Sequence, residues 1–271
     1  MAINRRRFLE LGTAALAFAA RPARPARAAA GRGGKVAPGV RFRELRLATT
    51  HPIDSMEQFY AGVLGMKVLD RGRRHVTVAA GETRLTYRRR AEDGGAPFYH
   101  VAFNIPENKI LSARDWQLER TPLDPNPNAS RHPDHPDIVH FEHWDAHAVF
   151  FRDPAGNILE HIARHTLDNA APGPFSSRDI ACCSEIALVL DADDLRPEAD
   201  RIGERIGAAR YRNSSARFVA LGDENGLVLV MKKGFSLRGD ADIYPTDVEM
   251  AAGGRSFDHT LPGLPYRLHA G

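Results

Sequence analysis

A pattern of one strand, one helix and further strands occurs three times along the 271 residues of this chain. The copies begin with the segments 44–69, 100–120 and 185–211. Each segment opens with a short strand of alternating polar and apolar residues, continues through a turn into an amphipathic helix, and is followed by extended segments. A single copy leaves an open sheet edge that needs covering. The repeat therefore predicts an α+β fold assembled from βαβββ units.

Turns and Gly- or Pro-rich stretches separate these units. Unit one covers about 42–90, and unit two covers about 98–165 and ends in a hairpin with an Asp-Pro-Ala-Gly turn. The Pro- and Gly-rich segment 169–177 is interpreted as a linker before the third unit, at 178–234. The tail at 235–271 is weakly patterned and too short for a fourth full unit, so we expect it to be irregular.

The first thirty residues do not fit the repeat. Arg5 and Arg6 precede a mild apolar run, and the segment ends in three alanines. This order resembles a bacterial twin-arginine signal peptide. The apolar run is too short to span a bilayer stably. We therefore expect the export machinery to recognise residues 1–30 and the mature protein to be periplasmic or secreted; the alternative is an amphipathic or disordered basic tail.

The charge and the cysteine content argue against a nucleic-acid-binding protein and a disulfide-stabilised scaffold. The formal charge is +3, but six arginines and one glutamate lie in the first thirty residues, so the remainder is slightly acidic. A chain of that charge has no electrostatic preference for nucleic acid. The two cysteines, Cys182 and Cys183, are adjacent, and neighbouring residues bridge only through a strained ring.

Two motifs resemble a known superfamily. The stretch FYAGVLGMKVLD lies at the first helix, and VFFRDPAGNILEHIA forms the last hairpin of unit two. Both are similar to the vicinal oxygen chelate superfamily, which includes glyoxalase I, bleomycin and fosfomycin resistance proteins and extradiol dioxygenases. The resemblance extends over about 42–233. It implies that two βαβββ units, here units one and two within 31–168, pair into a curved, cup-shaped mixed sheet with a divalent metal at its floor.

The same resemblance implies a set of metal ligands. In the superfamily the ligands come from the first and last strands of each paired unit. Those positions are His100 and Glu160 in unit two and Glu44 in unit one. The third unit has Glu185 at its first-strand position but Val230 at its last, so it lacks a complete set. We interpret it as a structural or dimerising unit, which makes a homodimer an expected assembly.

The residues around Glu160 favour a site independently of the resemblance. Glu160 lies between Ile158 and Ile162 on one face of a strand, where an ionised carboxylate costs several kcal/mol to desolvate unless a cation or donor compensates. A metal bound by one imidazole and two carboxylates would compensate all three groups. That donor set, with open positions for two substrate oxygens, suits Fe(II), Mn(II), Ni(II) or Zn(II).

The fourth ligand position falls on Arg84, which cannot bind a metal. Its guanidinium could pair with Glu44 or Glu160 and replace the metal, or bind an anionic group of a substrate. The register of unit one leaves alternatives. A slip of two residues would offer Glu82 in place of Arg84, and a slip of one would put Leu45 at the first-strand position.

Several other residues have both a functional and a structural interpretation. His147 could act as an acid or base at the cup, or be a half-exposed strand histidine. Tyr99, Phe103 and Trp144 could line an aromatic substrate pocket, although core packing is the commoner role. His161 alternates with the glutamate before it and should point away from it. An irregularly spaced group favours a solvated loop that shapes the pocket over a metal-binding tract: His132, His135, His140 and His143.

Three hypotheses about function follow. The first is an exported protein of glyoxalase or extradiol-dioxygenase type, which uses a divalent metal on a small oxygenated substrate, with Glu160 and His147 as catalytic groups. A metal-dependent lyase or isomerase and a dioxygenase are both open. The second is a metal-free protein that binds or sequesters a small molecule, as bleomycin resistance proteins do. The third is an assembly role with a vestigial cup.

Overall fold

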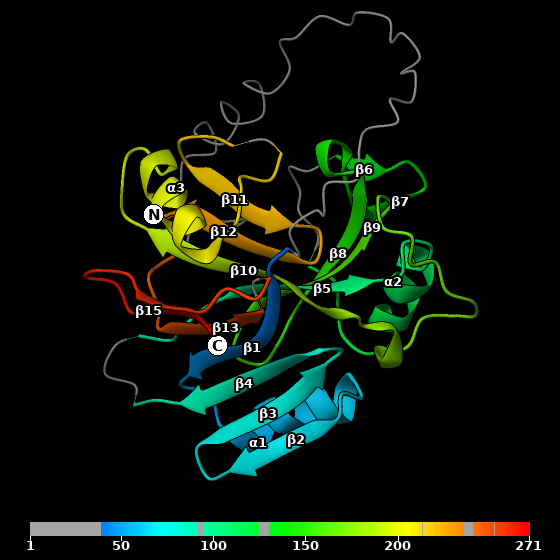
Figure 1. Ribbon diagram of the computed structural model, residues 1–271. Helices are drawn as coiled ribbons and strands as arrows, with labels where there is room; N and C mark the ends of the chain where they lie inside the picture. Colours follow the sequence, from blue (N-terminus) through cyan, green and yellow to red (C-terminus); the bar gives the residue numbers. More distant parts are fainter. Residues whose placement is uncertain (1–38, 92–94, 125–129, 213, 236–240, 252) are drawn as a thin grey trace, which may run out of the picture. The chain divides into compact units, whose positions relative to one another are not determined.

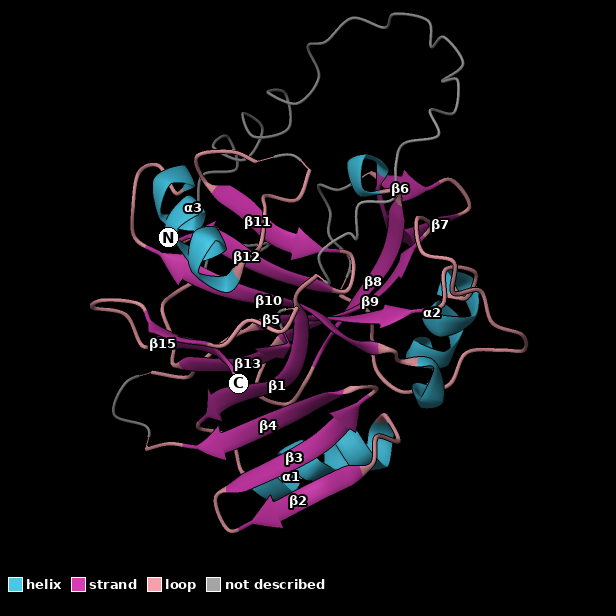
Figure 2. Ribbon diagram, viewed as in Figure 1, coloured by secondary structure: helices cyan, strands magenta, loops and turns pink. Residues whose placement is uncertain are grey.

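The computed structural model describes residues 39–271 except 92–94, 125–129, 213, 236–240 and 252 (Figure 1). The expected export signal at 1–30 lies outside the described residues and stays a prediction. Within the described ranges, every helix is too short or too polar to cross a membrane. The strands form two mixed sheets with a few short helices beside them, which confirms the α+β class (Figure 2).

The first unit has the expected layout. It consists of β1 (Arg41–Thr49), α1 (Ile53–Glu57) with a π-helical continuation at Gln58–Val63, β2 (Val68–Gly72), β3 (His75–Ala80) and β4 (Thr83–Arg89). Strand β4 runs parallel to β1 and antiparallel to β3. The helix places Ile53, Met56 and Tyr60 in the core against this sheet.

The second unit has the expected strand and helix followed by several strands. It consists of β5 (His100–Ile105), α2 (Ile110–Leu118), β6 (Arg131–His132), β7 (His135–Phe141), a 3-10 turn at Glu142–Trp144, β8 (Ala146–Arg152) and β9 (Ile158–Arg164). The tract expected to be a solvated loop thus forms two strands from Arg131 onward, because β7 pairs with β6 through His135 and with β8 through Val139 to Phe141. The Asp-Pro-Ala-Gly turn needs its glycine, because Gly156 has a φ of 85°.

The third unit is shorter than expected. After a 3-10 turn at Ser177–Asp179 it consists of β10 (Cys182–Leu190), α3 (Arg196–Ile206), β11 (Phe218–Asp223) and β12 (Gly226–Lys232). In the described residues only two named strands follow its helix, and an isolated bridge between Arg210 and Leu221 stands where a third would begin. Cys182 and Cys183 are free and buried in β10.

The C-terminal tail is a sheet-forming unit, which corrects the expectation that it is irregular. It forms β13 (Thr246–Ala251), β14 (Phe257–Thr260) and β15 (Tyr266–Ala270). Strand β15 runs parallel to β13 and antiparallel to β14, as β12 does to β10 and β11. Thr246, Val248 and Met250 are buried and alternate with half-buried residues along β13. The tail therefore repeats the strands of the third unit without a helix.

The order of the strands also corrects the expected pairing of the units. One sheet has the order β14-β15-β13-β1-β4-β3-β2, and the other has the order β11-β12-β10-β5-β9-β8-β7-β6. Unit two thus pairs with unit three through antiparallel β5 and β10, while unit one pairs with the tail through antiparallel β1 and β13. Because β5 already covers the first strand of the third unit, that edge gives no reason for dimerisation, and a homodimer stays a prediction.

The two motifs that carried the resemblance meet in one buried hydrogen-bond network. The Tyr60 hydroxyl donates to Asp153 Oδ2 at 2.9 Å and lies 2.7 Å from the Tyr87 hydroxyl. Asn157 donates to the same carboxylate at 2.7 Å and accepts from the Tyr99 amide at 2.9 Å. Buried polar groups of this kind are stable only when each has a partner. The motifs therefore join unit one to the last hairpin of unit two.

Candidate metal centre

Three side chains converge on one face of the eight-stranded sheet. His100 opens β5, while Glu160 in β9 and Glu185 in β10 both lie opposite Ala102 of β5. The two glutamates therefore flank the small side chain of Ala102. His100 Nε2 lies 3.3 Å from Glu160 Oε2 and 3.5 Å from Glu185 Oε2. In the described part of the chain, these residues form the one group of three possible ligands whose donor atoms all lie within 4.8 Å of one another.

A buried arginine completes this cluster. Arg164, the last residue of β9, is fully buried and donates to Glu185 Oε1. Its Nε donates to Asn104 Oδ1 at 3.1 Å, and its guanidinium lies 5.5 Å from the ring centre of Trp144. One oxygen of Glu185 is therefore held by Arg164, and the other faces His100.

Burial and the neighbouring charges shift the pKa values in this cluster. Burial and then the charge of Glu185 raise the pKa of Glu160, although His100 partly opposes them. Burial lowers the pKa of His100, but hydrogen bonds and charges from the two glutamates outweigh it and raise that pKa to about 10. Burial likewise opposes ionisation of Glu185, but His100 and Arg164 lower its pKa overall. Without a bound cation, His100 therefore carries a proton between two carboxylates.

Two charged groups of the cluster have atoms without partners. Glu160 Oε1 and Arg164 Nη1 are both buried and have no hydrogen-bond partner. An unmade hydrogen bond of a buried charged group costs about 1–3 kcal/mol or more. A cation beside Glu160 Oε1 and an oxygen ligand beside Arg164 Nη1 would satisfy both atoms. The residues present thus fit a divalent metal together with an anionic or carbonyl oxygen.

The walls around the cluster are apolar and partly aromatic. Phe150 lies opposite Glu160 on β8, with its ring centre 6.2 Å from that of His100. Trp144 lies over Arg164 and packs edge-on against Tyr211 with ring centres 5.4 Å apart. Trp144 therefore lies at the cluster, and its contact with a substrate stays a prediction. Apolar walls lower the local dielectric and strengthen every charge interaction inside.

The structure does not bring Glu44 to His100 and Glu160. Glu44 lies in the seven-stranded sheet, where it accepts from Arg46 Nη2 and Thr86 Oγ1, each at 2.6 Å. Arg84 Nε lies 3.5 Å from Glu44, so it pairs with this glutamate and not with Glu160. Thr86 lies opposite Arg46 in this sheet, just as Glu160 lies opposite Ala102 in the other sheet. Thr86 and Arg46 therefore occupy the positions that correspond to Glu160 and Ala102. The guanidinium of Arg46 thus compensates the carboxylate of Glu44 in the seven-stranded sheet.

Three more of the predicted site residues lie on the far face of the eight-stranded sheet. Tyr99 and Phe103 alternate with the cluster residues along β5, so both point into the core. The Tyr99 hydroxyl donates to the Pro245 carbonyl at 2.7 Å. His147 alternates with Ala146 and Ala148, which face the cluster, and its Nδ1 lies 2.8 Å from His165 Nε2. These residues therefore cannot touch a ligand bound at His100.

His161 points away from Glu160, as its place in the alternation predicts. Its Nε2 lies 3.1 Å from Gln117 Oε1, and the rings of Phe151 and Phe175 surround it. Burial lowers the pKa of His161 to about 3. This histidine is therefore a neutral core residue.

Glu185 and Arg164 are the two residues that the sequence reasoning did not place in the site. Glu185 stood at the first-strand position of the third unit, but that unit was interpreted as structural. Arg164 continues the alternation through Ile158, Glu160 and Ile162, so the period of β9 alone puts it on the same face. Both signals were present in the sequence.

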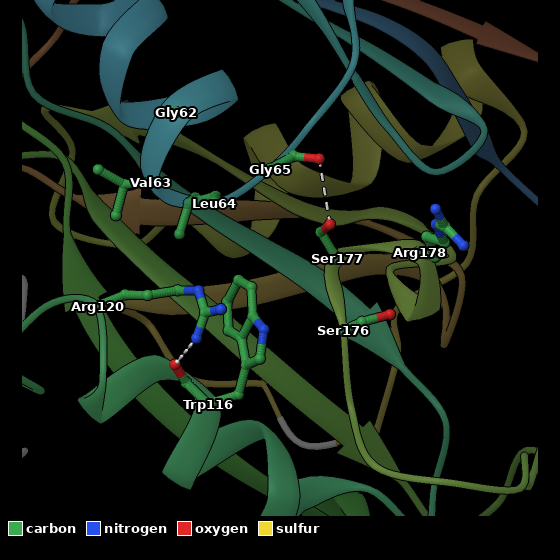
Figure 3. Close-up of a pocket in the computed structure, with 9 residues that line it drawn as sticks. All are labelled: Gly62, Val63, Leu64, Gly65, Trp116, Arg120, Ser176, Ser177 and Arg178. Carbon is green, nitrogen blue, oxygen red and sulfur yellow. Dashed lines mark hydrogen bonds between the residues drawn. The ribbon is translucent and has the colours of Figure 1, made fainter.

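A hollow of about 420 Å³ lies away from this centre (Figure 3). Arg120 stacks on Trp116 at 3.9 Å from the ring centre, and Ser177 donates to the Gly65 carbonyl at 3.2 Å. Its lining residues include no histidine and no carboxylate. It therefore offers no ligands for a metal.

Comparison with solved structures identifies the fold. A proposed dioxygenase from Bacillus subtilis aligns with a TM-score of 0.53 at 14% identity, over 85% of this chain and 84% of its own. Glyoxalase I from Zea mays aligns with a TM-score of 0.48 at 14% identity, over 85% and 92%. A glyoxalase/bleomycin resistance protein/dioxygenase from Nocardioides has a TM-score of 0.35 at 17% identity, over 62% and 99%.

The likeness to the Bacillus subtilis structure, with the strand order, supports the α+β fold of βαβββ units. At such low identity it shows the fold alone. No protein-family model and no curated protein matches the chain. The function therefore has to be argued from the site itself.

Proposed function

We propose that this chain is an exported protein that binds one divalent metal ion through His100, Glu160 and Glu185 and uses it on a small oxygenated substrate. One observation carries the proposal: three donor side chains converge on a buried point where Glu160 Oε1 has no partner. One imidazole and two carboxylates suit Fe(II), Mn(II), Ni(II) or Zn(II). Such an ion supplies Lewis-acid polarisation of bound oxygens.

The residues of the chain have separate roles in this proposal. Arg164 Nη1 donates to a substrate oxygen that carries or develops negative charge, while its other nitrogens hold Glu185 and Asn104 in place. Glu160 Oε1 is the oxygen left for the metal, because it has no other partner, and Oε2, 3.3 Å from His100, exchanges a proton with the imidazole and through it with the substrate. The apolar walls around Phe150 and Trp144 exclude water.

The donor set favours proton transfer over oxygen activation. By the family resemblance, dioxygenases of this fold take two histidines and one glutamate, whereas this centre has one histidine and two glutamates. A second carboxylate that can carry a proton suits a lyase or isomerase of glyoxalase type. We therefore propose an enolisable carbonyl compound with two neighbouring oxygens as the substrate class.

The test is the metal content and metal affinity of the full chain. Purified protein should bind one equivalent of Zn²⁺ or Mn²⁺, and Glu160→Gln and Glu185→Gln should each lower the affinity at least 100-fold. Glu44→Gln is the matched control, because Glu44 is also a part-buried strand glutamate beside an arginine but lies in the other sheet. Absence of stoichiometric metal in the natural chain, or unchanged affinity in Glu160→Gln, would refute the proposal.

The ion pair of Arg164 with Glu185 favours a second candidate function. A protonated His100 and Arg164 together neutralise both carboxylates without any metal. The centre would then be a polar floor beneath an apolar cup that sequesters a small molecule. Isothermal titration with metal-free protein separates the two: tight binding of an aromatic or anionic ligand in the presence of EDTA supports this candidate.

Export rests on residues outside the described part of the chain. We propose that residues 1–30 direct twin-arginine transport, since Arg5 and Arg6 precede an apolar run and three alanines. The change of both arginines to lysine should retain the full-length precursor in the cytoplasm of a bacterial host. Fractionation and immunoblotting check this, and a periplasmic product from the Lys-Lys variant would contradict it.

A further inference from the structure

Strands β6, β7 and β8 lie at one end of the eight-stranded sheet (Figure 1). The rings of five histidines contact one another there, on the far face of the sheet. The register of the strands produces this cluster: His132 pairs with His135 across β6 and β7, and His140 pairs with His147 across β7 and β8. His165 follows directly after β9. All five are partly exposed, so an ion from solution can reach them.

One pair in this cluster has the geometry of two ligands to a common ion. His147 Nδ1 and His165 Nε2 face each other at 2.8 Å. Two imidazole nitrogens that each lie about 2.0–2.1 Å from one ion are about 2.8 Å apart in square-planar geometry and about 3.4 Å apart in tetrahedral geometry. The separation seen here therefore needs little change on metal binding. The contact is now a hydrogen bond, so metal binding requires that its proton leave and that both rings turn until their lone pairs meet at the ion.

A carboxylate supports the same pair from behind. His165 Nδ1 lies 3.1 Å from Glu107 Oε2. A histidine whose second ring nitrogen donates to a carboxylate has its tautomer and orientation fixed, and this is the usual support of metal-bound histidines. Glu107 thus fixes the tautomer in which His165 Nε2 accepts, here from His147 Nδ1–H, and a metal ion would replace that proton.

The remaining imidazoles can supply further ligands. The His140 ring stacks on His147 with centres 4.4 Å apart, and the His132 ring lies 5.7 Å from it. Among the described residues these rings do not form a preformed triad, so a third ligand requires a side-chain rotation.

We propose that His147 and His165, supported by Glu107 and completed by His140 or His132, form a second metal site that binds a borderline divalent ion such as Cu²⁺. This site is separate from the candidate centre at His100, because His147 lies on the opposite face of β8 from Ala146 and Ala148. Imidazole-rich sites prefer Cu²⁺ over the other divalent metals of the first row. The site does not depend on the proposed function of the cup.

Electron paramagnetic resonance of the full chain with Cu²⁺ tests this site. The natural protein should show a Cu²⁺ species with coupling to at least two histidine nitrogens, in addition to any Cu²⁺ that the cup binds. His147→Ala should lower the Cu²⁺ affinity at least 100-fold, and Glu107→Gln, which removes no ligand, should lower it about 10- to 100-fold. His143→Ala is the matched control, because His143 is exposed in the same region but has no ring contact with the cluster among the described residues.

The outcomes separate this site from the cup. Glu160→Gln should leave the histidine signal unchanged whether or not the cup binds metal. Thermal unfolding of each variant without Cu²⁺ verifies folding, and Glu107→Gln keeps the test decisive if His147→Ala unfolds. Affinities of His147→Ala and Glu107→Gln within twofold of the natural chain, or a spectrum without nitrogen coupling, would overturn the proposal.

Discussion

Replacing Arg164 with methionine probes the electrostatics of the candidate metal centre directly. The Arg164 side chain is 0% exposed, and that of its partner Glu185 is 3% exposed. Removing one partner of a buried ion pair costs about 3–5 kcal/mol, because the other charge is left without compensation. His100 still faces the second oxygen of Glu185 at 3.5 Å. We therefore expect the lower end of that range for Arg164→Met without metal.

Urea unfolding followed by circular dichroism, in EDTA at pH 7, measures this loss. The matched control is Arg84→Met. Arg84 also pairs with a glutamate, at 3.5 Å, but its side chain is 49% exposed. Ion pairs at such exposure contribute about 0–1 kcal/mol. The double variant Arg164→Met/Glu185→Gln should recover part of the loss, since it no longer leaves a carboxylate without its guanidinium.

Added metal should then rescue the variant. A divalent ion at Glu185 replaces the missing positive charge, and free metal at 100 times its dissociation constant adds about 2.7 kcal/mol to the stability of the form that binds it. Zn²⁺ should thus return most of the stability that Arg164→Met loses. It should change the stability of Glu160→Gln little, because that variant lacks one of the three ligands. If Arg164→Met is no less stable than Arg84→Met, the ion pair with Glu185 does not have the assigned role. If Zn²⁺ stabilises neither Arg164→Met nor the natural chain, the centre is not a metal site.

Two further predictions concern buried groups outside the centre. His161 has a pKa of about 3 in the folded chain against about 6.5 when unfolded. Between these values the unfolded state binds more protons, so the free energy of unfolding decreases as the pH is lowered. The natural chain should lose about 2 kcal/mol more than His161→Phe between pH 7 and pH 5; equal losses in urea unfolding would exclude this linkage. Tyr60→Phe removes one of the donors to buried Asp153 and should cost about 1–3 kcal/mol, visible as a lower urea midpoint with an unchanged slope. A shift worth less than about 0.5 kcal/mol would mean that the bonds from Asn157 are sufficient for this carboxylate.

Local patterns in the sequence were sufficient for the elements and for half of the site. The alternation in β5 and β9 fixed the faces of His100 and Glu160, and the spacing of strand, helix and turn fixed the repeat. These features depend on neighbours along the chain. The same alternation also placed Arg164 on the face of Glu160, although only the structure gave it a partner.

The pairing of the units depends on contacts between distant segments. Glu44 and Glu185 both open a first strand, and nothing near either residue shows which one lies beside β5. The decisive strand is β13, which lies in the weakly patterned tail and carries Asp247 and Glu249. Both carboxylates accept from Arg46 at 2.8 Å, on a strand far away in the sequence. When the partner of a polar residue lies far away in the sequence, the sequence alone predicts a solvated segment at that residue.

The contrast between Arg46 and the centre at His100 gives the two sheets different dependence on the surrounding medium. Arg46 is a tethered cation, bonded to Glu44, Asp247 and Glu249 whatever ions are present. The cluster in the other sheet holds its carboxylates with one arginine and an imidazole that a metal can displace. A chelator should therefore loosen β5, β9 and β10 but leave β1 and β13 unaffected. Amide hydrogen exchange would show this as protection lost from one sheet only, so that one half of the molecule responds to metal supply and the other does not.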